Sequence, residues 1–196
     1  MKGTGETKGE RTRRRVLDVA VRRFADDGYR ATSVSAIARE AGISQAAVYA
    51  YFAGKAALFD AAVDVDAAEL IAGARAELDE DLPLVDLIPA LLLHLRLGVD
   101  QHRLARRVLA GQEPDVIHRL TDLPALQEIT AELAGILRTA GEQGEIDPTV
   151  DPDALALGVE TVVLGLLMSS VQVPGEADRR VPAILAVFQT LFRSPT

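Results

Sequence analysis

The sequence lacks cysteine and tryptophan, and only 4% of its 196 residues are aromatic. The absence of cysteine excludes disulfide bonds, thiolate metal sites and cysteine nucleophiles. The few aromatic residues also avoid one long stretch, since none lies between Phe59 and Phe188. Aliphatic side chains must therefore wall any ligand pocket in that stretch. Such a pocket suits an aliphatic or alicyclic ligand and cannot stack against a flat cation.

Uninterrupted apolar runs of the length needed to span a membrane, roughly twenty residues, are also missing. Residues 84–99 are apolar but contain three polar side chains and Pro89, and residues 154–173 contain Glu160 near their middle. The first fifteen residues are polar and basic, unlike a secretory signal. We therefore expect a soluble, cytoplasmic protein with no membrane partner, in which both runs form buried helices.

Residue groups that carry catalysis are missing as well. No nucleophile–base pair or glycine-rich phosphate loop follows from the spacings, so we expect neither an enzyme nor a cofactor. The three histidines are His94, His102 and His118. His94 and His102 lie eight residues apart, which is about two turns of a helix and too far to share an ion. No histidine pair has i, i+4 spacing, and we therefore predict no metal site.

The formal net charge of −8 is unevenly distributed. Residues 1–55 contain eleven Lys/Arg and six Asp/Glu, a net charge of +5. Residues 56–196 contain ten Lys/Arg and twenty-three Asp/Glu, a net charge of −13. A basic front on an acidic body indicates that only the N-terminal end meets a polyanion.

A first helix is predicted from Thr12 to Gly28. It follows residues 1–10, whose Gly-, Lys- and Glu-rich composition predicts a disordered arm. Apolar side chains recur on one face of the helix while arginines occupy the other, and Gly28 is a natural end. The apolar face consists of Val16, Leu17, Ala20, Val21, Phe24 and Ala25.

Two short helices joined by a tight turn follow. Thr32 or Ser33 can cap the first of them, Gly42 ends it, and Ser44 opens the second two residues later. Two short helices with a Gly-containing turn are the signature of a helix-turn-helix. With Val48 and Phe52 facing inward, the outward side chains of the second short helix are Gln45, Ala46 and Tyr49.

The rest of the chain has helical periodicity throughout, with no strand alternation. We expect helices over residues 55–78, 84–111, 114–140, 153–171 and 178–192, and leave open whether Pro124 divides the third. The predicted fold class is therefore all-α.

The run from Thr12 to Phe59 resembles the N-terminal domain of TetR-family repressors. The matched pieces are Phe24-Ala25, Gly28-Tyr29, Ala31-Thr32-Ser33, Ile37-Ala38, Ala41-Gly42-Ile43-Ser44, Val48-Tyr49, Tyr51-Phe52 and Lys55. The resemblance implies a homodimer whose two heads enter successive major grooves of a palindromic operator in double-stranded DNA. It also implies a C-terminal domain that binds a small molecule and thereby weakens the binding of the heads to DNA. The expected domains are a disordered arm at residues 1–10, a three-helix helix-turn-helix domain at residues 11–56, and a helical effector-binding and dimerisation domain at residues 57–196.

Base reading is expected at the start of the third helix, because the N-terminal residues of a recognition helix meet base edges in the major groove. The amide of Gln45 can pair bidentately with an adenine. Ala46 and Ala47 permit close approach and can touch a thymine methyl. Many relatives carry lysine at the position of Gln45, and some read a base at the position of Ser35.

Phosphate contacts are implied by the resemblance at Ser33, Tyr49, Tyr51 and Lys55. Each has a simpler interpretation that the sequence leaves open. The two tyrosines can pack the small domain, and Ser33 and Ser44 can act as N-caps, a role compatible with a phosphate contact. The arginine cluster at residues 13–15 is either a solvated face or a contact to phosphates beside the minor groove.

The acidic half contains the candidate effector pocket. Polar candidates within or beside the apolar helix that begins at Leu84 include His94 and His102, and Met168 is a candidate for the wall. A lone histidine on such a helix can equally belong to the core or the surface. Glu160 can contact a ligand, lie at a dimer seam or reach solvent, and the sequence does not rank these.

Two apolar stripes in the last two helices are candidates for a dimer interface. They are core stripes by pattern alone, and the family resemblance favours an intersubunit four-helix bundle. Their members are Leu155, Val159, Val162, Val163, Leu166, Leu167, Ile184, Leu185, Phe188 and Leu191.

The sequence thus predicts a bacterial, DNA-binding transcriptional regulator. We expect a repressor that a small apolar ligand releases from a palindromic operator. An activator on the same fold and an architectural DNA-binding protein without an effector are the alternatives; the second predicts no palindrome preference and no ligand response.

Overall fold

A computed structural model describes residues 7–79, 82–113, 120–147, 149–173 and 175–191. Within these ranges the regular structure is helical and contains no strand, which confirms the all-α prediction. The elements are α1 (Lys8–Ala31), α2 (Val34–Glu40), α3 (Gln45–Tyr49), α4 (Lys55–Ala76), α5 (Leu84–Gly98), α6 (Arg103–Leu109), the 3-10 turn η1 (Leu120–Asp122), α8 (Pro124–Glu142), α9 (Pro152–Gln172) and α10 (Glu176–Leu191).

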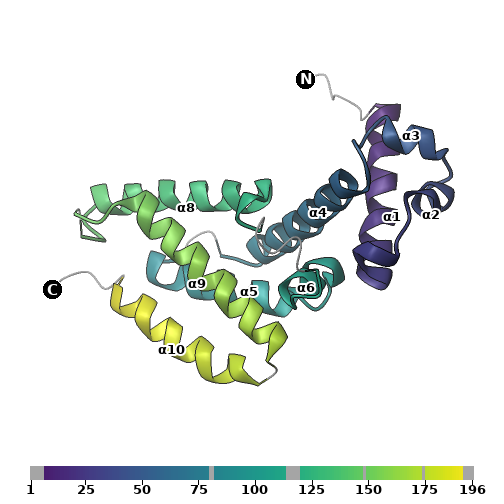
Figure 1. Ribbon diagram of the computed structural model, residues 1–196. Helices are drawn as coiled ribbons and strands as arrows, with labels where there is room; N and C mark the ends of the chain where they lie inside the picture. The colour runs from purple at the N-terminus through teal and green to yellow at the C-terminus, as the bar shows by residue number, and fades with distance from the viewer. Residues whose placement is uncertain (1–6, 80–81, 114–119, 148, 174, 192–196) are drawn as a thin grey trace.

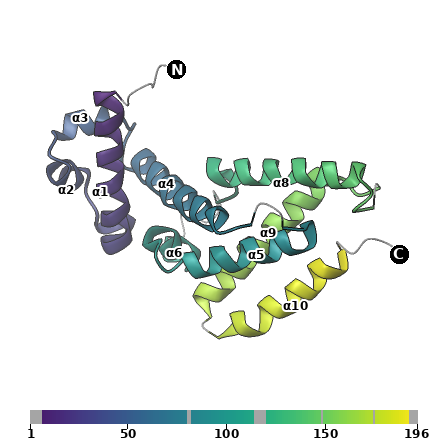
Figure 2. The ribbon, with the colours of Figure 1, turned by 180° about the vertical axis from the view of Figure 1, so that it is seen from behind.

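The helices form a small head, α1 to α3, and a larger body, α4 to α10 (Figure 1). The helix α4 runs from the head into the body, and α6 packs against both α1 and α4. Seen from behind, α8 and α10 lie on opposite sides of the body, with α9 crossing between them (Figure 2). The head core is built on Phe24, which meets Phe59 edge to face with ring centroids 4.8 Å apart. The same buried cluster continues into α6 through Leu104 and Val108.

The expected disordered arm ends earlier than predicted, because residues 8–10 belong to α1. The cause is a capping box. The Thr7 hydroxyl accepts the Glu10 N–H at 3.2 Å, and the Glu10 carboxylate accepts the Thr7 N–H at 2.6 Å. That hydrogen bond from the Thr7 N–H holds the pKa of Glu10 below its ordinary value. The rest of the predicted arm, residues 1–6, lies outside the described residues.

The single helix predicted over residues 84–111 is two helices, α5 and α6. A long-range contact accounts for the new start at Arg103, since the Asp66 carboxylate of α4 accepts the Ala105 N–H at 2.7 Å in the first turn of α6. Pro124, a possible division of the helix predicted over residues 114–140, is the first residue of α8. Part of the predicted helix over residues 114–140, residues 114–119, lies outside the described residues.

The body core has two clusters of buried side chains. One gathers Ile88, Leu137 and Phe188, the other gathers Leu70, Leu95 and Val99, and half-buried Val163 packs against both. The expectation that residues 154–173 form a buried helix is wrong for a single chain, because only 28% of the most apolar window of α9 is buried. By length and composition alone, α9 is the one described helix that could cross a membrane.

Candidate nucleic-acid interface

The turn between α2 and α3 is fixed by local hydrogen bonds. Ser33 caps α2, with its hydroxyl accepting the Ala36 N–H at 3.2 Å. The helix ends in a Schellman motif, in which the Ile43 N–H donates to the Ala38 carbonyl at 3.0 Å and the Gly42 N–H donates to the Arg39 carbonyl at 3.2 Å. Gly42 has φ of 67°, a conformation that favours glycine. The turn therefore gives α3 a defined direction.

The helix α3 presents one face to solvent. Ser44 caps it, its hydroxyl accepting the Ala47 N–H at 3.1 Å. Val48 is buried in the head core, whereas Gln45 and Ala46 are exposed and Tyr49 is 49% exposed, as the periodicity predicts. The Gln45 Nε2 donates to the Tyr49 hydroxyl at 3.3 Å. An amide and a phenol therefore lie together on the uncovered side of the short helix.

Serine hydroxyls gather at the start of α2, where those of Ser33 and Ser35 lie 3.1 Å apart. Both side chains are exposed, and Ala47 of α3 is half-buried. Tyr51 is 38% exposed, and its hydroxyl lies beside Gly9 of α1. The predicted contact residues therefore fall into an outward group on α3 and flanking groups at the starts of α1 and α2.

Lys55 is held by two contacts inside the chain. Its Nζ donates to the Arg30 carbonyl at 3.2 Å and lies 4.5 Å from the centroid of the Tyr29 ring. The ammonium thus ties the start of α4 to the end of α1, a role that the sequence did not indicate. An ammonium has three donors, so this tie leaves donors for a second acceptor.

The arginines of α1 divide into two sets. Arg22 and Arg23 pair with Glu40 of α2 at 3.4 and 2.6 Å. The hydrogen bond from Arg23 lowers the pKa of Glu40, and the same bond raises the pKa of Arg23. Near the start of the helix, by contrast, Arg13 and Arg15 are exposed and make no ion pair within the described residues, and the Arg13 guanidinium lies 5.2 Å from the Phe52 ring centroid. This second set lies at the N-terminal end of α1, where Tyr51 also reaches the surface.

Head and body are joined at the end of α1 by contacts that the sequence did not reveal. Glu113, whose side chain is 9% exposed, accepts the Tyr29 N–H at 3.0 Å and the Arg107 Nε at 2.7 Å through the same oxygen. Gly28 next to it has φ of 78°, and a Cβ there would clash with the Arg107 guanidinium. The glycine therefore allows both the kink in α1 and the close approach of α6.

A polar cavity of about 310 Å³ lies beside this joint. Three arginines line it, and each is paired: Arg103 with Asp26 at 2.6 Å, Arg106 with Asp100 at 3.0 Å, and Arg107 with Glu113. The remaining lining residues are Ala25, Asp100 and Gln112. The residues predicted for the effector pocket do not line this cavity.

The predicted pocket residues are dispersed. His102 precedes α6 and its Nδ1 lies 3.0 Å from an Asp66 oxygen. Met168 packs against the cluster around Leu95, and His94 is half-buried on α5. Glu160, whose role was left open, accepts a hydrogen bond from the Thr130 hydroxyl of α8 at 2.6 Å.

The predicted dimer stripes mix two faces of the last helices. Val159, Leu166, Leu167 and Phe188 are buried inside the chain's own core, so these four are not available to a partner. Leu155, Val163 and Ile184 pack against that core, Leu185 is half-buried, and the side chain of Leu191 lies outside the described residues. Val162 is 36% exposed, and three apolar side chains on α9, at its C-terminal cap and on α10 are more exposed: Leu157 at 56%, Val173 at 51% and Val187 at 55%. Periodicity could not separate the faces because α9 is apolar around most of its circumference.

The fold and the exposed second helix of the turn define a helix-turn-helix transcriptional regulator. The family described as bacterial regulatory proteins, tetR family, matches residues 16–62. An uncharacterised HTH-type transcriptional regulator of Bacillus subtilis, YvkB, is 30% identical over 142 residues, which are 69% of this chain and 70% of that protein. The regulator UidR of Escherichia coli is 27% identical over 149 residues, 74% of each chain. The chain belongs to the TetR family.

A solved structure supports this assignment over nearly the full length. A TetR-family regulator from Mesorhizobium loti has a TM-score of 0.68 at 25% identity and covers 94% of this chain and 98% of its own. The prediction of a regulator rather than an enzyme is thereby confirmed.

Proposed function

We propose that this protein is a cytoplasmic repressor that binds a palindromic operator as a homodimer and is released by a small aliphatic molecule. The observation that carries the proposal is the exposed face of α3. It presents Gln45 and Tyr49 at the surface, on a helix whose direction the Gly42 turn defines. A side-chain amide at the start of such a helix can pair with an adenine in the major groove.

Base reading and phosphate positioning fall to different residues in this proposal. Gln45 reads a base, and Ala46 and Ala47 allow the close approach that this requires. The hydroxyls of Tyr49, Tyr51, Ser33 and Ser44 and the ammonium of Lys55 position the head on phosphates. Ser35 is the second candidate for a base contact, since it is exposed at the start of α2.

Dimerisation is proposed through the exposed face of α9, with α10 completing a four-helix bundle. The large exposed side chains Leu157 and Val162 lie on this face. A twofold interface uses the same patch on both copies, so an apolar helix left uncovered by its own chain can be covered by its own counterpart. The body, residues 57–196, then serves dimerisation and effector binding.

The side chains that form the core of the body favour an aliphatic effector. The two body clusters are aliphatic apart from Phe188. His94 is half-buried on α5 and makes no hydrogen bond or ion pair within the described residues, which leaves its ring free for a polar group of the ligand. The contacts of Arg103 with Asp26 and of Glu113 with Tyr29 offer a route by which the body can move the head.

The test is footprinting of the purified protein on genomic DNA of its host, followed by titration of the protected duplex. We expect a short protected site with inverted repeats, and specific affinity that falls about 5- to 150-fold when an aliphatic effector binds. A lipophilic compound library screened by thermal shift supplies that effector. Protection without any inverted repeat would contradict the operator proposal. Hits confined to flat aromatic cations would contradict the aliphatic pocket.

A further inference from the structure

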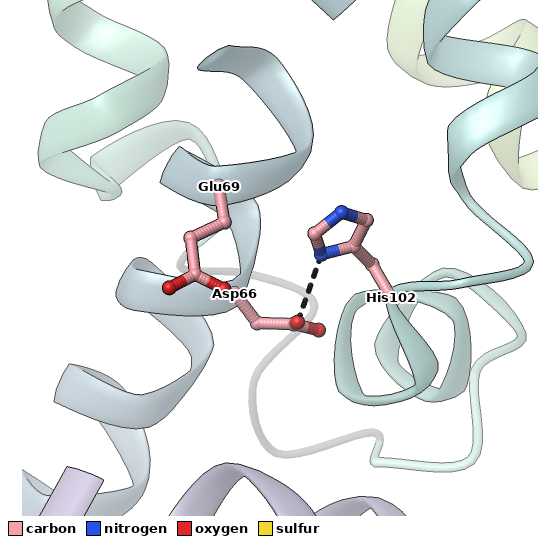
Figure 3. Close-up of side chains that lie close together, drawn as sticks. All are labelled: Asp66, Glu69 and His102. Carbon is pink, nitrogen blue, oxygen red and sulfur yellow. Dashed lines mark hydrogen bonds and ion pairs between the residues drawn. The ribbon is translucent and has the colours of Figure 1, made fainter. Parts of the chain in front are cut away.

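Three metal-ligating side chains meet between α4 and α6. Asp66 and Glu69 lie three residues apart on α4, and His102 precedes α6 (Figure 3). One ligand atom from each lies within 4.8 Å of the other two. Sequence spacing does not reveal this group, because the three residues come from two separate segments of the chain.

Asp66 on its own has a structural explanation. Its side chain is 5% exposed, and its two oxygens take the Ala105 N–H at 2.7 Å and the His102 Nδ1 at 3.0 Å. These bonds satisfy a buried carboxylate and hold the start of α6. Glu69, which is exposed, takes no part in these bonds.

Glu69 adds a second carboxylate beside the first. It makes no hydrogen bond or ion pair within the described residues, yet its oxygen lies within 4.8 Å of the Asp66 and His102 ligand atoms. Two carboxylates at this separation repel each other, the more so because one is buried. A cation placed among the three ligand atoms would relieve that repulsion.

We propose that Asp66, Glu69 and His102 bind one divalent transition-metal ion, for which Zn²⁺ is the reference probe. One imidazole nitrogen and two carboxylate oxygens are ligands that Zn²⁺ accepts, and three protein ligands leave one position for water. The imidazole favours Zn²⁺ over Mg²⁺, which prefers oxygen ligands. The ion takes the place of the proton between His102 Nδ1 and Asp66 Oδ1, and joins α4 to α6.

The test is calorimetric titration of the tag-free, full-length protein with ZnCl₂ and, separately, MgCl₂, after dialysis against a chelator. We expect one Zn²⁺ per chain, weaker Mg²⁺ binding, and a melting temperature that rises with Zn²⁺. Glu69→Gln should weaken Zn²⁺ binding at least about 10-fold, because even outer-shell partners of metal ligands are worth ~10- to 100-fold in affinity. Its melting temperature without metal should be no lower than that of the wild type, since Glu69 makes no bond to lose and its repulsion of Asp66 is removed.

The matched control is Glu77→Gln, the same substitution at the exposed C-terminal cap of α4, which should bind Zn²⁺ like the wild type. Co²⁺ supplies a second readout, since visible absorption bands of a four-coordinate site should appear in the wild type and be lost in His102→Gln. The proposal is overturned if Zn²⁺ does not saturate at one ion per chain, or if Glu69→Gln and Glu77→Gln bind Zn²⁺ equally.

Discussion

The head and the body are both helical, yet the head is built from local signals and the body from distant ones. In the head, Ser33 and Ser44 cap the helices that they precede, and Gly42 turns the chain between them. In the body, α6 begins where Asp66, from a different helix, accepts the Ala105 N–H. A boundary set by a neighbour in the sequence can be predicted from the sequence, whereas one set by a distant residue cannot.

The two regions also differ in how completely one chain covers them. The head has a closed core, in which Phe24 and Val48, together with Phe59 of α4, are each no more than 1% exposed. The body leaves α9, a long apolar helix, largely uncovered. We therefore expect the head to be complete in one chain and the body to need a second copy.

The prediction with the largest expected effect tests whether the body needs a second copy. Replacing Leu157 and Val162 together by Glu places charges on the exposed face of α9 without touching the core. We expect this double variant to sediment as a monomer and to lose tight operator binding, because one head alone contacts only half of a palindrome. Leu97→Glu is the control, since Leu97 is 61% exposed on α5 and should leave the dimer intact. A double variant that sediments as a dimer would place the interface elsewhere.

A prediction with a smaller expected effect compares a helix cap supplied by a distant residue with one supplied by a neighbour in the sequence. Asp66→Ala leaves the Ala105 N–H and His102 without their partner, which we expect to cost about 1–3 kcal/mol of stability. Ser44→Ala removes a local cap and should cost ~1 kcal/mol. Both are measured by chemical denaturation in chelator-containing buffer, with hydrogen exchange as the regional readout. Faster exchange should appear in α6 for the first variant and in α3 for the second. Unchanged exchange in α6 of Asp66→Ala would show that this residue does not set the start of α6.

The smallest effect concerns pH in the head. The folded-state pKa of Glu40 is lowered by its hydrogen bond with Arg23. Stability from this pair is therefore present above the unfolded-state pKa of Glu40 and is lost as pH falls through the lower folded-state value. Carboxyl NMR titration should show the lowered pKa in the wild type and its return toward the ordinary value in Arg23→Gln. Equal Glu40 pKa values in the two proteins would contradict the assigned cause.

Within the candidate site, the sequence predicted what periodicity and capping determine. It placed Gln45 and Tyr49 outward and Val48 inward, and it identified Ser33 and Ser44 as capping candidates. It missed the contacts of Lys55 with Arg30 and Tyr29, because these join the ends of two helices 25 residues apart.

In the body the pattern was less informative. The predicted stripe on α9 combined buried Val159 with exposed Val162. The helix is covered by its own chain on one side and is also apolar on the other, so its apolar residues do not mark a single face. The joint between Glu113 and Tyr29 was equally invisible, since their separation of 84 residues has no local signature.

The most direct test of the account asks whether Gln45 reads a base. Gln45→Ala, Lys55→Ala and the control Gln127→Ala, an exposed glutamine of the body, are titrated against the operator, all its single-base variants and a scrambled duplex at several salt concentrations. Gln45→Ala should cost about 1–3 kcal/mol on the operator and relax preference at one base pair in each half-site. Lys55→Ala should weaken all duplexes alike and lower the salt slope by about one unit per subunit, and Gln127→Ala should match the wild type. If Gln45→Ala ranks the single-base variants in the same order as the wild type, Gln45 does not read a base and the central claim fails.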